Sequence, residues 1–188
     1  MLETFTLKST LKTFYSPFKL LGVPIGKRMT AITCISNKVW VHSPIELNDA
    51  SIQLLRNMGN ITWVICPNLF HYLHVNAFQN IFPECQLFGV NGIEKKVKHC
   101  TFQSLEDERS SQLWNSDIQQ HNIKGASKIS EVVFFHQETK TLILTDLVFN
   151  LSHSTIWASC LMRLNGAHNK CTTTRVFKSM IEDKILFK

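Results

Sequence analysis

The sequence has 188 residues, a hydrophobic fraction of 44% and a formal net charge of +6. This length and composition predict one globular domain over residues 1–188. No apolar run reaches the roughly 18 residues of a membrane span, and no basic and apolar leader pattern opens the chain, so we expect neither a transmembrane helix nor a secretory signal. The basic residues are dispersed and lack aromatic interleaving, which predicts a solvated basic surface and no nucleic-acid partner.

The cysteines favour a structural role. There are six, and no two have the CxxC spacing of a zinc knuckle or a thioredoxin motif. Cys34 and Cys66 lie in apolar runs, where a free cysteine behaves as a small hydrophobic residue. No cysteine has an activating partner close in sequence, so we expect no catalytic thiol. The pattern favours a reducing, cytoplasmic environment.

The first strands are expected after an N-terminal arm. Residues 1–21 have no clear periodicity and are expected to be irregular or helical. Residues 29–36 and 39–42 are rich in β-branched and apolar side chains, which predicts two strands. Asn37 and Lys38 between them predict a two-residue hairpin connection.

A helix is predicted over residues 48–58. Asn48 or Asp49 can cap its first turn by accepting a backbone N–H bond. Apolar residues then recur at helical spacing, which predicts a buried stripe. Gly59 is expected to end the helix in a left-handed conformation.

The next elements predict a layered α/β fold. Residues 61–66 form a continuous apolar run, typical of a strand covered on both faces. A helix over 70–82 and a strand over 86–90 are expected to follow. The resulting order of strand, helix, strand, helix, strand is typical of a βαβ arrangement.

The second half of the chain is predicted to contain a loop, a strand hairpin and two helices. Residues 106–111 predict an exposed loop within a polar stretch, and residues 130–135 and 141–144 predict a strand hairpin. A helix is expected over about 154–164, with Ser154 as its cap. The chain is expected to end in a helical segment, residues 174–188.

The strongest candidate for a functional group is Asp146, which follows Thr145 at the end of an apolar strand. In α/β folds, ligands gather at the carboxyl ends of strands. A carboxylate at that place can hold a metal or act as a base. The alternative is that Asp146 only caps the turn after its strand.

Two histidines follow another predicted strand end at Asn68. His71 and His74 have i, i+3 spacing, so on a helix their side chains share one face. Two imidazoles and the carboxylate of Asp146 are a donor set for Zn or Fe. The alternative is a pair of partly exposed histidines without a ligand role.

His42 ends a third predicted strand and is expected near Asn68 and Asp146. A hydrogen bond between His42 and Asp146 would orient the imidazole and raise its basicity. A relay from Ser43 through His42 to Asp146 is disfavoured, because neighbouring residues on a strand point to opposite faces.

Glu131 opens the hairpin strand and is expected to face the same pocket as Asp146. His136 lies at the far end of that strand, beside the turn, and is expected to be exposed. The sequence has no GxGxxG and no GxxxxGK[ST] motif, so no glycine-rich phosphate loop is expected.

Five sequence blocks stand in a recognisable order and spacing. They are Arg28-Met29-Thr30, Trp40-Val41-His42-Ser43-Pro44, Pro67-Asn68 with His71, Glu131 to His136, and Thr141 to Leu147 with Asn150. Over residues 22–151 they resemble the DUF4336 family, which is similar to the metallo-β-lactamase fold. The resemblance implies an α/β fold, a four-layer αββα sandwich with a site along one edge of its sheets.

The resemblance also implies where metal ligands should lie. Aligned without gaps, the HxHxDH motif of metallo-β-lactamases falls on Asn68, Phe70, Tyr72 and Leu73, none of which is a usual ligand of that superfamily. A later histidine of the superfamily falls near Ser127, and only Asp146 is kept. A standard dinuclear zinc site is therefore not expected.

Two functions remain as hypotheses, and a third rests on charge alone. The leading one is a metallo-β-lactamase-like protein with a rearranged or lost metal site. If active, it would use one divalent metal, Zn or Fe, to hydrolyse an ester, amide or phosphoester. The ligands would be His71 and Asp146, joined by His42, His74 or Glu131.

The alternative is a non-catalytic domain without a metal that binds a small molecule or a protein in the degenerate pocket. Asn68, Tyr72, Glu131 and Thr145 would line that pocket. The apolar bulk of Phe70, Tyr72 and Leu73 at ligand positions favours this alternative. The third hypothesis, an anion or nucleic-acid binder, ranks last.

Overall fold

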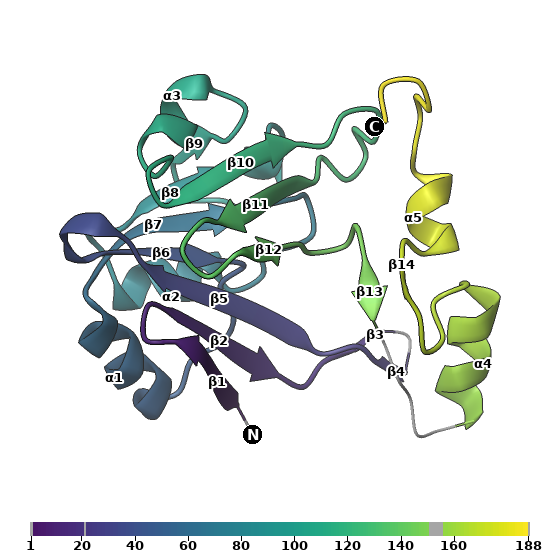
Figure 1. Ribbon diagram of the computed structural model, residues 1–188, viewed down its shortest axis with the longest axis horizontal. Helices are drawn as coiled ribbons and strands as arrows, with labels where there is room; N and C mark the ends of the chain where they lie inside the picture. Colours follow the sequence, from purple (N-terminus) through teal and green to yellow (C-terminus); the bar gives the residue numbers. More distant parts are fainter. Residues whose placement is uncertain (1, 21, 151–155, 188) are drawn as a thin grey trace.

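Two sheets face each other across a shared core in the computed structural model, which describes residues 2–20, 22–150 and 156–187 (Figure 1). The larger sheet has seven strands in the order β1-β2-β5-β6-β7-β8-β9. Its strands are antiparallel from β1 to β6 and parallel from β6 to β9. They span Glu3–Lys8 (β1), Leu11–Ser16 (β2), Lys27–Thr33 (β5), Lys38–His42 (β6), Asn60–Cys66 (β7), Gln86–Gly89 (β8) and Phe102–Ser104 (β9).

The second sheet is antiparallel, with the order β10-β11-β12. Its strands are Ile118–Asn122 (β10), Val132–His136 (β11) and Thr141–Ile143 (β12). Two short pairs complete the strands: Lys19–Leu20 (β3) with Val23–Pro24 (β4), and Phe149–Asn150 (β13) with Cys171–Thr172 (β14).

Five helices are described: Asp49–Met58 (α1), Val75–Ile81 (α2), Glu108–Gln112 (α3), Ile156–Leu164 (α4) and Arg175–Ser179 (α5). The βαβ prediction is confirmed, because α1 joins β6 to β7 and α2 joins β7 to β8, all three strands being parallel. Within the described ranges, no helix is long and apolar enough to cross a membrane.

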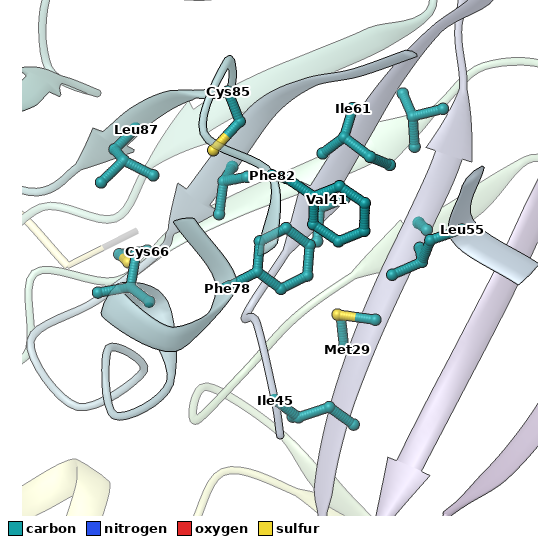
Figure 2. Close-up of a cluster of buried hydrophobic side chains, with 14 of the residues drawn as sticks. Met29, Val41, Ile45, Leu55, Ile61, Cys66, Phe78, Phe82, Cys85 and Leu87 are labelled. Atoms are coloured by element: carbon teal, nitrogen blue, oxygen red, sulfur yellow. The ribbon is translucent and has the colours of Figure 1, made fainter. Parts of the chain in front are cut away.

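The larger sheet has a core on each face. Helices α1 and α2 bury side chains such as Leu55 and Phe78 against Met29 and Val41 on its outer face (Figure 2). The inner core contains three tryptophans, among them Trp114, which is fully buried and contacts the rings of its neighbours edge-on. Burial of this amount of apolar surface is the main stabilising term of the fold.

The prediction of an irregular or helical N-terminal arm was wrong. Residues 3–8 and 11–16 form the antiparallel pair β1 and β2, and β2 continues the pairing onto β5. Leu11 and Phe14 are fully buried in this arrangement. The pairing with β5 joins residues distant in the chain, which local periodicity does not indicate.

The connection between β5 and β6 also differs from the prediction. Residues 35–37 form a turn of 3-10 helix in place of a two-residue hairpin. Ser36 and Asn37 have φ angles of 64° and 59°, a left-handed conformation that asparagine tolerates better than most residues.

Two predicted helices and one predicted loop are corrected. The helix expected over 70–82 is α2, which begins only at Val75. The expected C-terminal helix is short, since α5 ends at Ser179. The expected loop over 106–111 contains most of α3. The cap predicted at Ser154 lies outside the described residues.

Helix α1 begins and ends as capped helices do. The side chain of Asn48, rather than Asp49, accepts a hydrogen bond of 2.9 Å from the backbone N–H of Ser51. Gly59 ends the helix with φ 137° and ψ −160°, which is not the left-handed helical conformation expected. A Cβ at Gly59 would lie 2.5 Å from the backbone oxygen of Asn37.

Gly59→Ala is therefore expected to lower the free energy of unfolding by about 1–3 kcal/mol, because the side chain adds backbone strain and a clash. Urea unfolding monitored by tryptophan fluorescence measures the change. Gly22→Ala is the matched control, since Gly22 also has a positive φ but has open space around it. Equal losses for the two variants would contradict the role of the contact with Asn37.

Candidate functional site

The candidate site forms where the loop after β7 meets the start of β11. The backbone N–H of Val132 donates to the carbonyl of Pro67 at 2.9 Å, and that of Leu69 donates to the carbonyl of Ile129 at 3.0 Å. These two bonds hold the loop against the second sheet. Asn68 lies between them and is fully buried.

The amide of Asn68 is the centre of a polar cluster. Its Nδ2 atom donates to Oε2 of Glu131 at 2.7 Å and to Oδ2 of Asp146 at 2.8 Å. Oγ1 of Thr145 lies 3.1 Å from the same nitrogen. Three acceptor oxygens therefore surround one NH2 group that has only two hydrogens.

The orientation of this amide is fixed by its other end. Oδ1 of Asn68 accepts hydrogen bonds from the backbone N–H groups of Phe70 at 2.9 Å and His71 at 3.0 Å. An amide turned the other way would place N–H groups against N–H donors. The nitrogen of Asn68 therefore faces the carboxylates.

Glu131 is the most deeply buried acid of the cluster, with 1% of its surface exposed. Its Oε1 atom accepts bonds from the backbone N–H of Thr145 at 2.9 Å and of Asp146 at 3.2 Å, and from the hydroxyl of Thr145. Burial raises the pKa of Glu131 above its ordinary value, and these hydrogen bonds oppose the rise.

His71 and Asp146 form the accessible edge of the cluster. Nε2 of His71 lies 3.5 Å from Oδ2 of Asp146, and the two side chains are 27% and 26% exposed. The pair connects solvent to the buried amide, because the same Oδ2 atom accepts the bond from Asn68.

His42 is buried, with 2% of its surface exposed. Its ring stacks on Trp40 with centroids 5.5 Å apart and meets Phe134 edge-on. Among the described residues, its Nε2 atom has no hydrogen-bond partner. Burial, and to a smaller degree the charge of His71, lower the pKa of His42 to about 3.

The Ser43 relay is not formed. Oγ of Ser43 is buried and, like Nε2 of His42, has no hydrogen-bond partner in the described part of the chain. Ser43 also has a φ of 55°, which places it outside a regular strand.

His74 contacts Lys27 instead of joining the cluster. Nε2 of His74 lies 2.7 Å from Nζ of Lys27, and burial together with this charge lowers the pKa of His74. The shared helical face predicted for His71 and His74 does not exist, because α2 begins after both residues.

Tyr72 was expected to line the pocket and His136 to lie at the surface. Tyr72 is partly buried and has Nζ of Lys96 5.6 Å from its ring centroid. His136 was expected to be exposed, but it is 1% exposed, and its Nδ1 lies 2.8 Å from Oγ1 of Thr139. Burial lowers the pKa of His136.

The structure thus joins several predicted site residues by direct contacts: Asn68, His71, Glu131, Thr145 and Asp146. The sequence did not reveal that an amide is their centre. A pattern that indicates it is the asparagine directly after an apolar strand, since a side-chain oxygen there often accepts N–H groups of the following turn.

The His, Cys, Asp and Glu side chains of the described residues are poorly placed to bind a zinc ion. Residues 2–20, 22–150 and 156–187 contain no group of three His, Cys, Asp or Glu residues placed to hold an ion. The 3.5 Å between His71 and Asp146 matches two ligands of one ion, which lie about 3.3–3.5 Å apart for bonds of about 2.1 Å. Protein zinc sites use at least three such donors, and here the Asn68 amide occupies the adjoining position.

Comparison with solved structures defines the class: this is a protein of the metallo-β-lactamase fold. DIM-1 metallo-β-lactamase matches with a TM-score of 0.64 at 12% identity, over 95% of this chain and 94% of that one. A metallo-β-lactamase from Pontibacter korlensis matches with a TM-score of 0.61 at 10% identity, over 80% and 74%. These identities show a shared fold and nothing more.

The chain belongs to DUF4336, a domain of unknown function, whose family model matches residues 8–169. The match extends beyond the 22–151 span of the resemblance and includes β2 at one end and α4 at the other. No curated protein matches the chain.

Proposed function

We propose that this protein is a metallo-β-lactamase-fold domain in which a hydrogen-bonded amide has replaced the metal, and that it binds a small molecule at the resulting pocket. The observation that supports this is the position of the Asn68 nitrogen among the oxygens of Glu131, Thr145 and Asp146. An NH2 group satisfies acceptor oxygens that would otherwise attract a cation.

Electrostatics supports the replacement. Glu131 and Asp146 both bond to Asn68, and two neighbouring carboxylates repel each other unless a positive group lies between them. In a metal site, the ion supplies that charge. Here the partial positive charges of one amide and of the backbone N–H groups of Thr145 and Asp146 supply it.

The accessible part of the site suits recognition of a polar ligand. His71 and Asp146 are each about one quarter exposed, and the rest of the cluster holds them in place. A ligand that exchanges hydrogen bonds with this pair would bind to groups that are already ordered, which reduces the entropy cost of binding.

Metal content is the test. Untagged protein purified without chelator is expected to contain far less than one equivalent of Zn, Fe or Mn by mass spectrometry. Added Zn²⁺ is expected to leave the melting temperature unchanged. One tightly held metal per chain that is lost in Asp146→Ala would overturn the proposal. An exposed carboxylate, Asp49→Ala, is the control for non-specific metal binding.

A mononuclear metal hydrolase is the second candidate, and the distance between His71 and Asp146 favours it. It needs a third donor. Nε2 of His42 has no hydrogen-bond partner among the described residues, but it would have to move to join this pair, because no three such donors are placed around one ion there. This candidate predicts that His42→Phe and Asp146→Ala both abolish metal binding, whereas the amide proposal predicts no metal to lose.

A reducing, cytoplasmic location, suggested by six free cysteines, stays a prediction.

A further inference from the structure

An open groove lies between the two sheets next to the candidate site. It has a volume of about 410 Å³, within the range of small-molecule sites, and residues of β1, β2, β5 and β12 line it. The last lining residue on the β12 side, Leu144, directly precedes Thr145 and Asp146. Along the chain, the lining of the groove therefore ends one residue before the polar cluster.

The walls of the groove are apolar and uncovered. Leu7, Leu142 and Phe5 line it, and they are 61%, 57% and 47% exposed. Single exposed apolar side chains are ordinary, but three that share one concave surface favour an apolar ligand.

Arg28 is the cation at this groove. Arg28 lines it and is in no ion pair with any described residue. Its guanidinium lies 5.6 Å from the ring centroid of Phe5 and 5.7 Å from that of Tyr15. Nη1 donates to Oγ1 of Thr13 at 3.0 Å, which holds the group in place and leaves further N–H donors for a ligand.

The floor of the groove is polar. Thr13 on β2 pairs with Thr30 on β5, and Thr30 pairs with His42 on β6, so the three side chains form a row across one face of the sheet. Thr13 and Thr30 line the groove. His42 continues the row, and no residue in the described part of the chain forms a hydrogen bond with its Nε2. Buried polar atoms without partners indicate a place for a water or a ligand group.

We infer that the groove binds an amphipathic carboxylate, a medium-chain fatty acid anion, with its carboxylate on Arg28 and its chain along Leu7 and Leu142. A guanidinium binds a carboxylate through two parallel N–H bonds, a geometry that neutral groups do not reproduce. The inference goes beyond the proposed function, because the residues that line the groove are not those of the Asn68 cluster.

Calorimetric titration of the full, untagged chain with octanoate tests the inference. Octanoate is expected to bind with one site per chain, and Arg28→Gln is expected to weaken it by about tenfold or more. Arg28→Lys, which keeps the charge and loses the planar fork, is expected to be intermediate. Leu142→Ser, at an exposed position, is expected to weaken octanoate without lowering the melting temperature.

Two controls separate charge at the groove from charge in general. Arg56→Gln removes a cation from α1, on the other face of the sheet, and should leave octanoate binding unchanged. Octanamide, which has no charge, should bind wild type and Arg28→Gln alike and more weakly than octanoate. Any of the following overturns the inference: no octanoate binding, equal affinity in Arg28→Gln, or sedimentation that gives a dimer for wild type and a monomer for Leu142→Ser.

Metal analysis of the same preparation keeps the two proposals apart. Stoichiometric metal would overturn the amide-replacement function whatever octanoate does. Absent or Arg28-independent octanoate binding in metal-free protein would overturn only the inference about the groove.

Discussion

Asn68→Asp is expected to lower the free energy of unfolding by about 3–5 kcal/mol at pH 7, because it places a buried negative charge without a counter-charge. The substitution keeps the shape of the side chain, removes its two N–H donors and adds one negative charge. The oxygens of Glu131 and Asp146 would then face a third carboxylate at the distances now occupied by hydrogen bonds, 2.7 Å and 2.8 Å. Urea unfolding at pH 7 measures the loss.

The same variant is expected to gain affinity for a divalent cation. The introduced carboxylate would join those of Glu131 and Asp146 around one point, and carboxylate oxygens are the donor type that Mn²⁺ and Ca²⁺ prefer. Millimolar Mn²⁺ should raise the melting temperature of Asn68→Asp and leave that of wild type unchanged. Rescue of both proteins alike would contradict the idea that the amide takes the place of a cation.

Asn57→Asp is the matched control for this experiment. Asn57 lies on the surface of α1 and accepts one exposed hydrogen bond from Gln53. Its replacement should change stability by at most about 0.5 kcal/mol, as surface substitutions usually do, and should give no response to Mn²⁺.

The sequence was a good guide to the parts of the fold that depend on local pattern. The apolar run over 61–66 and the helices on either side of it indicated parallel strands buried on both faces, and the structure has them. Asp146 was singled out because it ends a strand, and it lies in the polar cluster.

Two of the errors share a physical cause: each depended on a partner far away in the chain. Residues 3–16 carry no clear local period because their burial is decided by pairing with β5. His136 was expected at the surface because it is close to a turn, yet it is buried in the middle strand of its sheet, between Ile118 on β10 and Thr141 on β12. The position of a residue in the sequence does not reveal whether other elements of the fold bury its side chain.

The failed pairing of His71 with His74 has a more local cause. The side chain of Asn68 accepts the backbone N–H groups of Phe70 and His71, which gives that segment a turn in place of the first helical turn. Helix α2 therefore begins late, and His74 contacts Lys27.

His42 is expected to make the protein sensitive to acid. Folding lowers the pKa of His42 from an ordinary value of 6.5 to about 3. A depressed pKa means that the stabilising contribution is complete above pH 6.5 and is lost as the pH falls toward the folded-state value. Between pH 7 and pH 4.5 the loss is roughly 2–3 kcal/mol, since each pKa unit corresponds to about 1.4 kcal/mol. Urea unfolding across this range measures it.

His42→Phe isolates this effect. A phenyl ring keeps the contacts with Trp40 and Phe134, and removing Nε2 breaks no hydrogen bond to a described residue. Stability at pH 7 should change by at most about 1.5 kcal/mol, because the swap nearly conserves volume. The slope of stability against pH should fall by the contribution of one histidine.

Only the difference between wild type and variant is informative, because Glu131 acts in the opposite direction. Its pKa is raised on folding, so its contribution is present at low pH and is lost as the pH rises through the folded-state value. His121→Gln, at an exposed position on β10, should keep the wild-type slope. If His42→Phe also keeps it, His42 does not stay neutral in the folded protein at pH 4.5, and its unpaired nitrogen must have a proton and a partner.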